Sequence, residues 1–521
     1  MSLGGSGDDL DWLAAELSGI RRELLPAQES RALVLALDQG GHASRAVLFD
    51  AVGREVATAH VPIATRRDVD RVEHDADELV ESLRTAVRDA CDAPLAAGRP
   101  IAAAGLATQR STVCCWDTRD GAALSPAISW QDRRAADWLE RTLGARAAWV
   151  RALTGLPLSP HYGASKLRWC LDELAAVSLA TRDGRLAMGP LASFLLHRLC
   201  RERPSCADPA NASRTLLFDP ALLDWSTPLL EAFGLPRAAL PRCVGTLHAF
   251  GTLEVDAHGR VPVRACSGDQ SAAIYAFGTP RPTTAFVNMG TGAFIQRTVR
   301  DADVPVPAGL LRSVVLAAAG DARHATWVHE GTVNGAHAAI EWLRGRVALD
   351  LARTLATLRS PLALDRVELL FLNGVGGLGS PYWRPRFPVE FTGLDGGAPP
   401  APALGELPQA VAVVESIAFL IATNLRALHD AAPLDRVVVT GGLSACDYLC
   451  EAIADLTALR VERPALREAT ARGIAWLAAG QPADWQPVPI ERTFAPRAGA
   501  KVAERYRRWQ HVMAERVARD P

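Results

Sequence analysis

The sequence predicts an α/β protein with two lobes, on three observations. Segments with the periodicity of strands and of helices alternate along most of the chain. One pattern, an apolar run followed by a glycine-containing loop and a second apolar run, occurs at residues 35–50 and again at residues 285–299, which indicates a duplicated hairpin. The length of 521 residues exceeds what a single hydrophobic core usually holds. We place the boundary between the lobes near residues 279–284, where "TPRPTT" interrupts regular structure.

The first lobe is expected to follow an N-terminal helix. Apolar residues at helical spacing predict an amphipathic helix within residues 8–30, as an appendage to the main fold. Two short apolar runs, "ALVLALD" and "RAVLFD", predict the strands of the first hairpin. They are followed by a predicted helix ("VEHDADELVESLRTAVRDAC"), a strand leading into a loop ("IAAAGLATQ") and a strand leading into a turn ("STVCCWDTRDG").

The second lobe is expected to repeat the hairpin, in "AFVNMGTGAFIQRTV", and to add helices to it. After the hairpin we predict a helix in "AAIEWLRG" and a strand that leads into a glycine loop in "RVELLFLNGVGG". The long apolar segment "LPQAVAVVESIAFLIATNLRALHDA" predicts a buried helix. The last predicted unit is a strand, a glycine turn and a helix in "RVVVTGGLSACDYLCEAIADL".

The composition is that of an ordinary globular protein. A formal net charge of −2 gives no electrostatic bias toward nucleic acid or a membrane surface, so we expect neither as a partner. The ten cysteines are scattered without paired CxxC elements, which favours reduced structural thiols over a zinc site. The first residues lack a basic segment followed by an apolar one, and no run approaches about 18 apolar residues. We therefore expect a cytoplasmic location.

Two familiar nucleotide motifs are disfavoured. Gly374, Gly376 and Gly379 satisfy G-x-G-x-x-G, but a Rossmann site needs a helix to open at the last glycine, and the prolines of "SPYWRPRFP" prevent that. A P-loop needs Gly-Lys-Ser/Thr, and neither of the two lysines, Lys166 and Lys501, follows such a loop. If the chain handles a nucleotide, backbone N–H groups of other glycine turns must hold the phosphates, with a metal offsetting their charge.

Three glycine turns and two aspartates could form such a site. The turns lie at residues 39–44, 290–292 and 441–442. Asp38 precedes the first turn, where it is either a ligand of hydrated Mg²⁺ or a turn-forming aspartate. Asp269 lies between a small-residue turn and an apolar segment, where it is either a helix N-cap or a general base for a substrate hydroxyl.

A set of short segments occurs in order between about residues 31 and 480: "LDQGGHASRAVLFD", "GLATQRSTVCCWD", "AISWQDRRAADW", "NASRTLLFD", "SGDQSAAIYAFG", "NMGTGAF", "GSPYWRP", "VVVTGGLSACDYL" and "ERPALREATARGIAWLA". This set resembles the FGGY carbohydrate kinases and is most similar to their glycerol kinase branch. The resemblance implies a two-lobed, actin-like ATPase fold with a ribonuclease-H-like core in each lobe, and ATP·Mg²⁺ and substrate in the cleft between the lobes. It divides the chain into an N-terminal helical extension (1–30), a sugar-binding domain (31–281), a nucleotide-binding domain (282–485) and a C-terminal tail (486–521).

The resemblance also implies roles for individual residues. It makes Asp269 the catalytic base, which also contacts the metal and the acceptor, and it makes Asp38 the residue that organises Mg²⁺ and phosphates. Positions that match the nucleotide site are Gly40, Gly41, His42, Arg45, Gly290, Thr291, Gly292, Gly441 and Gly442. Positions that match the acceptor site are Arg110, Ser111, Trp130, His161, Gln270 and Phe294.

The chain departs from the family pattern on both sides of this site. Gly41 and His42 replace two threonines of the first loop, and His42 is either a phosphate donor with a pH-dependent charge or a solvent-facing residue. Thr440 replaces an aspartate before the last glycine pair. In the acceptor site, Ser111 replaces a glutamate and His161 replaces a tyrosine. Because a polar pocket discriminates by which partners are missing, we expect a longer polyol or a ketose to be preferred over glycerol.

The resemblance therefore predicts an ATP-dependent kinase that phosphorylates a primary hydroxyl of a polyol or sugar. The alternative is a regulatory protein of the same fold, which binds nucleotide and sugar with little transfer activity; the altered first loop and Ser111 motivate it. A homodimer is what the resemblance leads us to expect.

Overall fold

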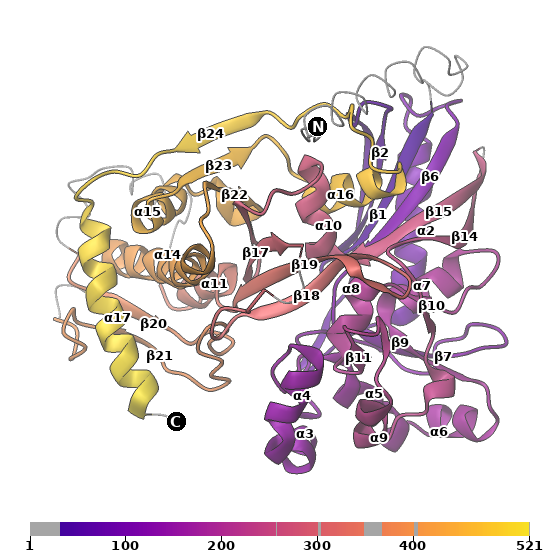
Figure 1. The fold of residues 1–521 in the computed structure, drawn as a ribbon, viewed down its shortest axis with the longest axis horizontal. Coiled ribbons are helices and arrows are strands. Elements are labelled where there is room, and N and C mark those ends of the chain that lie inside the picture. The colour runs from indigo at the N-terminus through magenta and orange to yellow at the C-terminus, as the bar shows by residue number, and fades with distance from the viewer. Residues whose placement is uncertain (1–31, 257, 301–303, 348–366, 401–404, 520–521) are drawn as a thin grey trace, which may run out of the picture. The chain divides into compact units, whose positions relative to one another are not determined.

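The computed structural model describes residues 32–256, 258–300, 304–347, 367–400 and 405–519 (Figure 1). The chain divides into two compact units. The first unit comprises Met1–Pro280, Ser313–Thr326 and Glu468–Pro487; the second comprises Arg281–Arg312, Trp327–Arg467 and Val488–Pro521. The helix expected within residues 8–30 lies outside the described residues.

A six-stranded sheet organises the first unit, in the order β14-β15-β6-β1-β2-β3. All seven residues of β1 are buried, as its continuous apolar run predicts. β1 pairs antiparallel with β2 and parallel with β6, and β6 pairs parallel with β15. The strands are β1 (Leu33–Gln39), β2 (Ala43–Phe49), β3 (Glu55–Pro62), β6 (Ile101–Thr108), β14 (Leu247–Val255) and β15 (Gly259–Gly268).

A second sheet of the first unit has the order β4-β5-β8-β7-β9. The helices include α2, which begins where the Asp75 side chain accepts hydrogen bonds from the backbone N–H groups of Asp77 and Glu78. The remaining elements of the first unit are β4 (Arg66–Asp68), β5 (Arg71–His74), α2 (Ala76–Cys91), β7 (Val113–Asp117), β8 (Ala127–Ile128), α3 (Ala136–Leu143), α4 (Ala147–Thr154), α5 (Gly163–Glu173), α6 (Ala175–Arg182), β9 (Leu186–Pro190), α7 (Leu191–Leu199), β10 (Cys206–Ala207), α8 (Pro209–Ala212), β11 (Phe218–Asp219), β12 (Asp224–Trp225), α9 (Thr227–Phe233), β13 (Arg242–Cys243), α10 (Asp269–Ala273) and α16 (Ala469–Ala478).

A seven-stranded sheet in the order β18-β19-β17-β16-β22-β23-β24 contains the strands of the second unit. Within β18 and β19, the residues between Ser313 and Thr326 are assigned to the first unit. β16 pairs antiparallel with β17 and parallel with β22, which is the relation that β1 has to β2 and β6. The duplicated hairpin predicted from the sequence is therefore confirmed. The elements are β16 (Thr284–Met289), β17 (Ala293–Val299), β18 (Leu311–Ala318), β19 (Asp321–Val333), α11 (His337–Arg344), β20 (Leu370–Asn373), β21 (Val389–Thr392), α14 (Glu406–Ala431), β22 (Arg436–Thr440), α15 (Asp447–Thr457), β23 (Arg460–Pro464), β24 (Ile490–Phe494) and α17 (Lys501–Arg519).

The long helix α14 is buried in the core of the second unit, as predicted. By length and composition it is the one helix among the described residues that could cross a membrane, but most of its apolar stretch is covered by the rest of the fold. The C-terminal segment also belongs to this core. β24 extends the sheet beside β23, and α17 packs Tyr506 and Trp509 against Phe419 of α14.

The glycines at 374–379 serve packing. From Gly374 to Pro388 the described chain contains no helix, which confirms the argument against a Rossmann site. A Cβ on Gly374 would collide with the carbonyl oxygens of Phe387 and Pro388, and one on Gly379 would collide with that of Thr332. Close backbone contact therefore accounts for these glycines.

Candidate active site

One group of predicted site residues lies at an edge of the first-unit sheet. In the parallel pairs of this sheet, Asp38 of β1 is in register with Ala107 of β6, and Thr108 of β6 is in register with Gly268 of β15. The carboxyl ends of three neighbouring strands thus meet at this edge, where α/β proteins commonly bind their ligands. Asp269 follows the third of these strands directly, so the topology brings the two predicted aspartates to the same place.

Asp38 is buried and lies close to a second carboxylate. Its Oδ2 is 3.2 Å from Nη1 of Arg45, and Nε of Arg45 is 3.5 Å from Oε2 of Glu468. Burial raises the pKa of Asp38 to about 7; Arg45 opposes this rise, and the negative charge of Asp269 adds to it. The carboxylates of Asp38 and Asp269 are donors of the kind that hydrated Mg²⁺ takes, since it binds one or two carboxylates together with substrate phosphates. Among the described residues, no group of three or more His, Cys, Asp or Glu side chains forms a fuller cation site.

Asp269 is the first residue of α10, and Gly268 occupies the N-cap position. The interpretation of Asp269 as the helix cap is therefore wrong. The backbone N–H of Gln270 donates to Oδ1 at 2.7 Å, and Nε2 of Gln270 lies 3.3 Å from Oδ2. Nε of Arg110 is 3.9 Å from Oδ1. The side chain keeps 23% of its surface exposed, so a substrate hydroxyl can reach it.

The first glycine loop joins β1 to β2 and is held by Gln109, a residue that the sequence interpretation did not single out. The N–H of Gln109 donates to Gln39 O at 2.8 Å, and its Nε2 lies 3.3 Å from Gly40 O. A Cβ on Gly41 would have 3.8 Å of clearance from the nearest described atom, Gln109 Oε1, so this face of the loop is open. His42 is exposed, and partial desolvation together with Arg67 and Arg45 lowers its pKa.

The predicted acceptor residues of the first unit follow the same strand edge. Arg110 and Ser111 form the turn after β6, where Ser111 adopts a left-handed backbone with φ of 65°. The Ser111 Oγ is buried and has no hydrogen-bond partner among the described residues, as expected of an atom that meets a ligand or water. The rings of Trp130 and His161 make an edge-to-face contact with centroids 5.5 Å apart. Burial first, and then the nearby cation of Lys166, lowers the pKa of His161 well below its usual value.

The second unit carries the other predicted glycine turns. Because β16 and β22 are parallel, with Asn288 in register with Thr440, the turns that follow them are neighbours. Gly441 has φ of +84°, and a Cβ there would collide with Asn288 Oδ1 and Met289 O. A Cβ on Gly442 would meet no described atom within 4 Å, which leaves room for a ligand.

The turn that contains Gly290, Thr291 and Gly292 leads from β16 into β17. The N–H of Gly290 donates to Gly292 O at 2.9 Å, which closes the turn. Phe294, predicted to contact the acceptor, is half-buried on β17 opposite Thr332.

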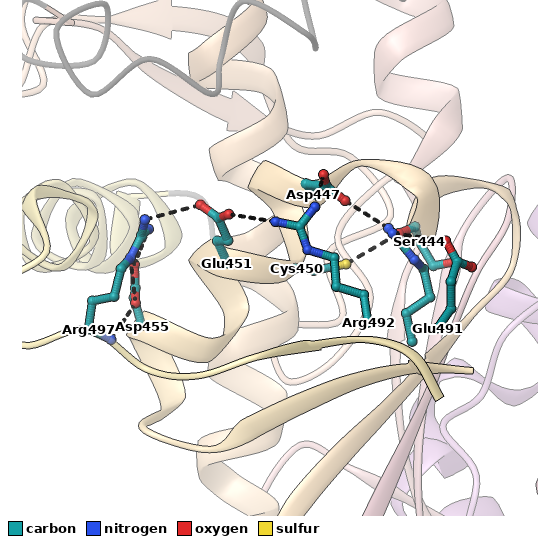
Figure 2. A network of polar contacts seen from close by, with 9 residues as sticks. Ser444, Asp447, Cys450, Glu451, Asp455, Glu491, Arg492 and Arg497 are labelled. Carbon is teal, nitrogen blue, oxygen red and sulfur yellow. Dashed lines mark hydrogen bonds and ion pairs between the residues drawn. The ribbon is translucent and has the colours of Figure 1, made fainter. Parts of the chain in front are cut away.

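A polar network supports the turn at 441–442. Nη1 of Arg463 donates to Ser444 O at 2.8 Å and to Asp447 Oδ1 at 2.9 Å, and Arg492 also donates to Asp447. Figure 2 shows Ser444 and Asp447 toward one end of a series of polar contacts that continues through Arg492 and Glu451 to Arg497. Sequence reasoning missed this network because its arginines come from β23 and β24, which are far from the turn in sequence.

Comparison with protein families matches both units. Residues 33–277 match the model of the N-terminal domain of the FGGY family of carbohydrate kinases, and residues 285–481 match that of its C-terminal domain. The chain belongs to the FGGY family of carbohydrate kinases. It is accordingly a kinase, a phosphotransferase whose acceptor is an alcohol group, and ATP is the donor expected for the family.

Relatives of this FGGY kinase match over nearly the whole chain. The glycerol kinase of Bordetella parapertussis is 34% identical over 500 residues, which cover 92% of this chain and 96% of the relative. Glycerol kinase 1 of Pseudomonas aeruginosa is 33% identical over 495 residues, which cover 92% and 98%.

Solved structures support the two-domain, actin-like fold. Plasmodium falciparum glycerol kinase with ADP has a TM-score of 0.81 at 20% identity, covering 93% of this chain and 98% of that one. Xylulose kinase from Rhodospirillum rubrum has a TM-score of 0.76 at 20% identity, covering 93% and 98%. At this level of identity the likeness concerns the fold.

Proposed function

We propose that this chain transfers the γ-phosphoryl group of ATP to a primary hydroxyl of a polyol or sugar, with Asp269 as the general base. The observation that carries the proposal is the arrangement at the first-unit strand edge. There a partly exposed carboxylate, oriented by Gln270 and next to Arg110, shares the edge with the buried carboxylate of Asp38. A base of this kind removes the hydroxyl proton as the oxygen attacks the phosphoryl group.

The proposed mechanism gives each part of the chain a task. The acceptor binds against Arg110, Gln270 and the Trp130–His161 pair, with its reacting hydroxyl at Asp269. Gln270 fixes the orientation of the carboxylate, because its backbone N–H donates to Oδ1 and its Nε2 donates to Oδ2. Phe294 of β17 is also proposed to contact the acceptor.

The nucleotide is proposed to bind through backbone N–H groups. The turn at 290–292 and the first loop, with Gly40, His42 and Arg45, take the phosphates, and the turn at 441–442 takes the adenosine side. Mg²⁺ bound with ATP, held by Asp38 and Asp269, would offset charge on the transferred phosphoryl group.

The acceptor is proposed to be larger than glycerol, although the curated relatives are glycerol kinases. Ser111 is short and neutral, and its buried Oγ has no described partner. It offers the acceptor one hydroxyl and occupies less space than the glutamate that the family pattern has at this position. His161 is kept neutral by its surroundings, so it supplies one donor and one acceptor. These features favour a longer polyol or a ketose, because a pocket with unpaired polar groups discriminates strongly by hydroxyl pattern.

A cytoplasmic location is also proposed. All ten cysteines are free thiols, and nine of them are buried, which suits a reducing compartment that also supplies ATP.

The test is an ATP-coupled screen of the purified 521-residue chain over glycerol, tetritols, pentitols and ketopentoses. We expect turnover with at least one acceptor, and a higher kcat/KM for a longer acceptor than for glycerol. Calorimetry with ATP and the same acceptors runs in parallel. Binding of both ligands without phosphorylated product would favour the regulatory alternative, and glycerol as the best acceptor would contradict the proposed specificity.

A further inference from the structure

Lys166 is a buried cation that the proposed mechanism does not use. It lies on α5 with only 1% of its surface exposed. Its Nζ donates to Ser111 O at 3.1 Å and to His161 O at 2.7 Å. One ammonium group therefore joins the turn after β6 to the segment before α5, and both bonds end on residues of the candidate acceptor site.

The Ser111 bond holds a backbone conformation that serine rarely adopts. With φ of 65°, Ser111 is left-handed, which is strained for a residue with a side chain unless its surroundings compensate. The same turn is bonded to the segment that carries Trp130, because Thr112 Oγ1 accepts from the backbone N–H of Trp130 at 3.2 Å. Displacement of Ser111 would thus move both the Ser111 hydroxyl and Trp130.

The use of lysine at this position is informative because the chain otherwise relies on arginine. Lysine occurs at only two positions in the sequence, Lys166 and Lys501, among 56 basic residues. A compact ammonium has three donors that can point at separate carbonyls, whereas the planar guanidinium fork suits a carboxylate. Lys166 bonds two carbonyl oxygens from different segments, which is the task that fits lysine.

The charged surroundings of Lys166 are mixed. Burial lowers its pKa to about 7; the negative charge of Asp132 opposes this, and Arg134 and Arg133 add to it. Asp132 is itself bound by Arg134 at 2.7 Å, so it supports Lys166 only in part. His161 accepts the Lys166 bond through its backbone carbonyl, and its ring has a pKa well below the usual value. The imidazole therefore stays neutral near pH 7, and its titration does not affect this bond.

We propose that Lys166 is a positioning residue that sets the acceptor specificity of this kinase, by fixing the backbone of Ser111 and His161 on the two sides of the acceptor pocket. The inference rests on the proposed function, because it takes these residues to contact the acceptor. It concerns the binding of acceptor and leaves the binding of ATP unaffected, since both of its bonds end on candidate acceptor residues of the first unit.

The experiment compares Lys166→Met with Lys501→Met, the same change at the exposed lysine of α17. With the best acceptor from the screen, we expect Lys166→Met to raise the acceptor KM about tenfold or more, consistent with loss of two buried hydrogen bonds, and to leave the ATP KM within about twofold. Lys501→Met is expected to change neither. If Lys166→Met does not yield folded protein, Lys166→Gln, which keeps two N–H donors, is used for the same comparison.

A second background tests whether the Ser111 conformation is what Lys166 maintains. Glycine adopts a left-handed backbone without strain, so Lys166→Met should raise the acceptor KM by a smaller factor in a Ser111→Gly background than in the wild type. An acceptor KM within twofold of wild type, an equal rise in both KM values, or the same factor in both backgrounds would overturn the inference. Lack of turnover by the wild type on every acceptor would instead contradict the proposed function, so the two failures are distinguishable.

Discussion

A buried ion pair is expected to hold the C-terminal helix on the second unit, and Arg505→Met tests it. Arg505 of α17 and Glu415 of α14 are both buried, with Arg505 Nε 2.8 Å from Glu415 Oε2 and a second guanidinium nitrogen bonded to Oε1. The Tyr448 hydroxyl also donates to this carboxylate. The substitution removes the main partner of Glu415 and leaves the carboxylate charge buried.

Removing one member of a buried pair costs about 3–5 kcal/mol, because the remaining charge stays desolvated. For a domain of this size each kcal/mol corresponds to roughly 2–4 °C in melting temperature. We therefore expect Arg505→Met to lower the melting transition of the second unit by about 6 °C or more. The double variant Arg505→Met/Glu415→Leu should recover most of this loss, because an apolar pair of similar volume needs no desolvation of charge.

The assay is thermal unfolding followed by circular dichroism, with chemical denaturation as a second probe. Arg508→Met is the matched control, because Arg508 lies on the same helix and pairs with Glu504 at the surface. Such a surface change is expected to stay within about 0.5 kcal/mol. A loss below about 1 kcal/mol for Arg505→Met, or a double variant less stable than the single one, would refute the reasoning.

Three further predictions follow from particular contacts. Gly441→Ala should destabilise the second unit and raise the ATP KM, since the added Cβ collides with backbone and φ is +84°. Gly442→Ala should raise the ATP KM without changing the melting temperature, because its Cβ meets no described atom within 4 Å. Asp447→Asn should raise the ATP KM about three- to tenfold and leave the acceptor KM unchanged, because it weakens the arginine contacts that hold the turn. The measurement is steady-state kinetics with each substrate varied in turn, and an equal rise in both KM values would contradict the prediction. Lys166 has a folded-state pKa of about 7 against 10.5 unfolded, so the cost of burying its charge is fully present below pH 7 and is relieved as pH rises. Between pH 7 and 9, the unfolding free energy of the wild type should therefore rise relative to that of Lys166→Met by about 1.4 kcal/mol per pH unit. A difference in unfolding free energy that does not change with pH would contradict this.

Much of the fold could be predicted because its elements have strong local signals. The continuous apolar runs of β1 and β16, the Asp75 cap of α2 and the long apolar α14 each specify an element without knowledge of tertiary contacts. The return of residues 468–487 to the first unit had no such signal, because it depends on packing between segments distant in sequence. The same holds for the C-terminal tail, where an apolar helix face indicates burial but not its partner.

The candidate site was predictable in part. The aspartates could be placed by position, because Asp38 and Asp269 lie at the ends of strand-like segments, and parallel strands bring such ends together. The left-handed conformation of Ser111 could not be foreseen, because serine has no local preference for it. The bonds of Lys166 and Gln109 were missed for a related reason: both donate to backbone carbonyls, and those carry no sequence signature.

The most direct test of the central claim is the turnover of Asp269→Asn on the best acceptor, measured by coupled ADP release. Asparagine keeps the size of the side chain and its neighbours but cannot take the proton, and general-base catalysis contributes about 10²-fold or more. The control is Asp172→Asn, which alters an exposed aspartate of α5 paired with Arg168. The account predicts a loss of about 10²-fold or more in kcat for Asp269→Asn, with the control at wild-type rate. Turnover of Asp269→Asn within about tenfold of wild type would contradict the account.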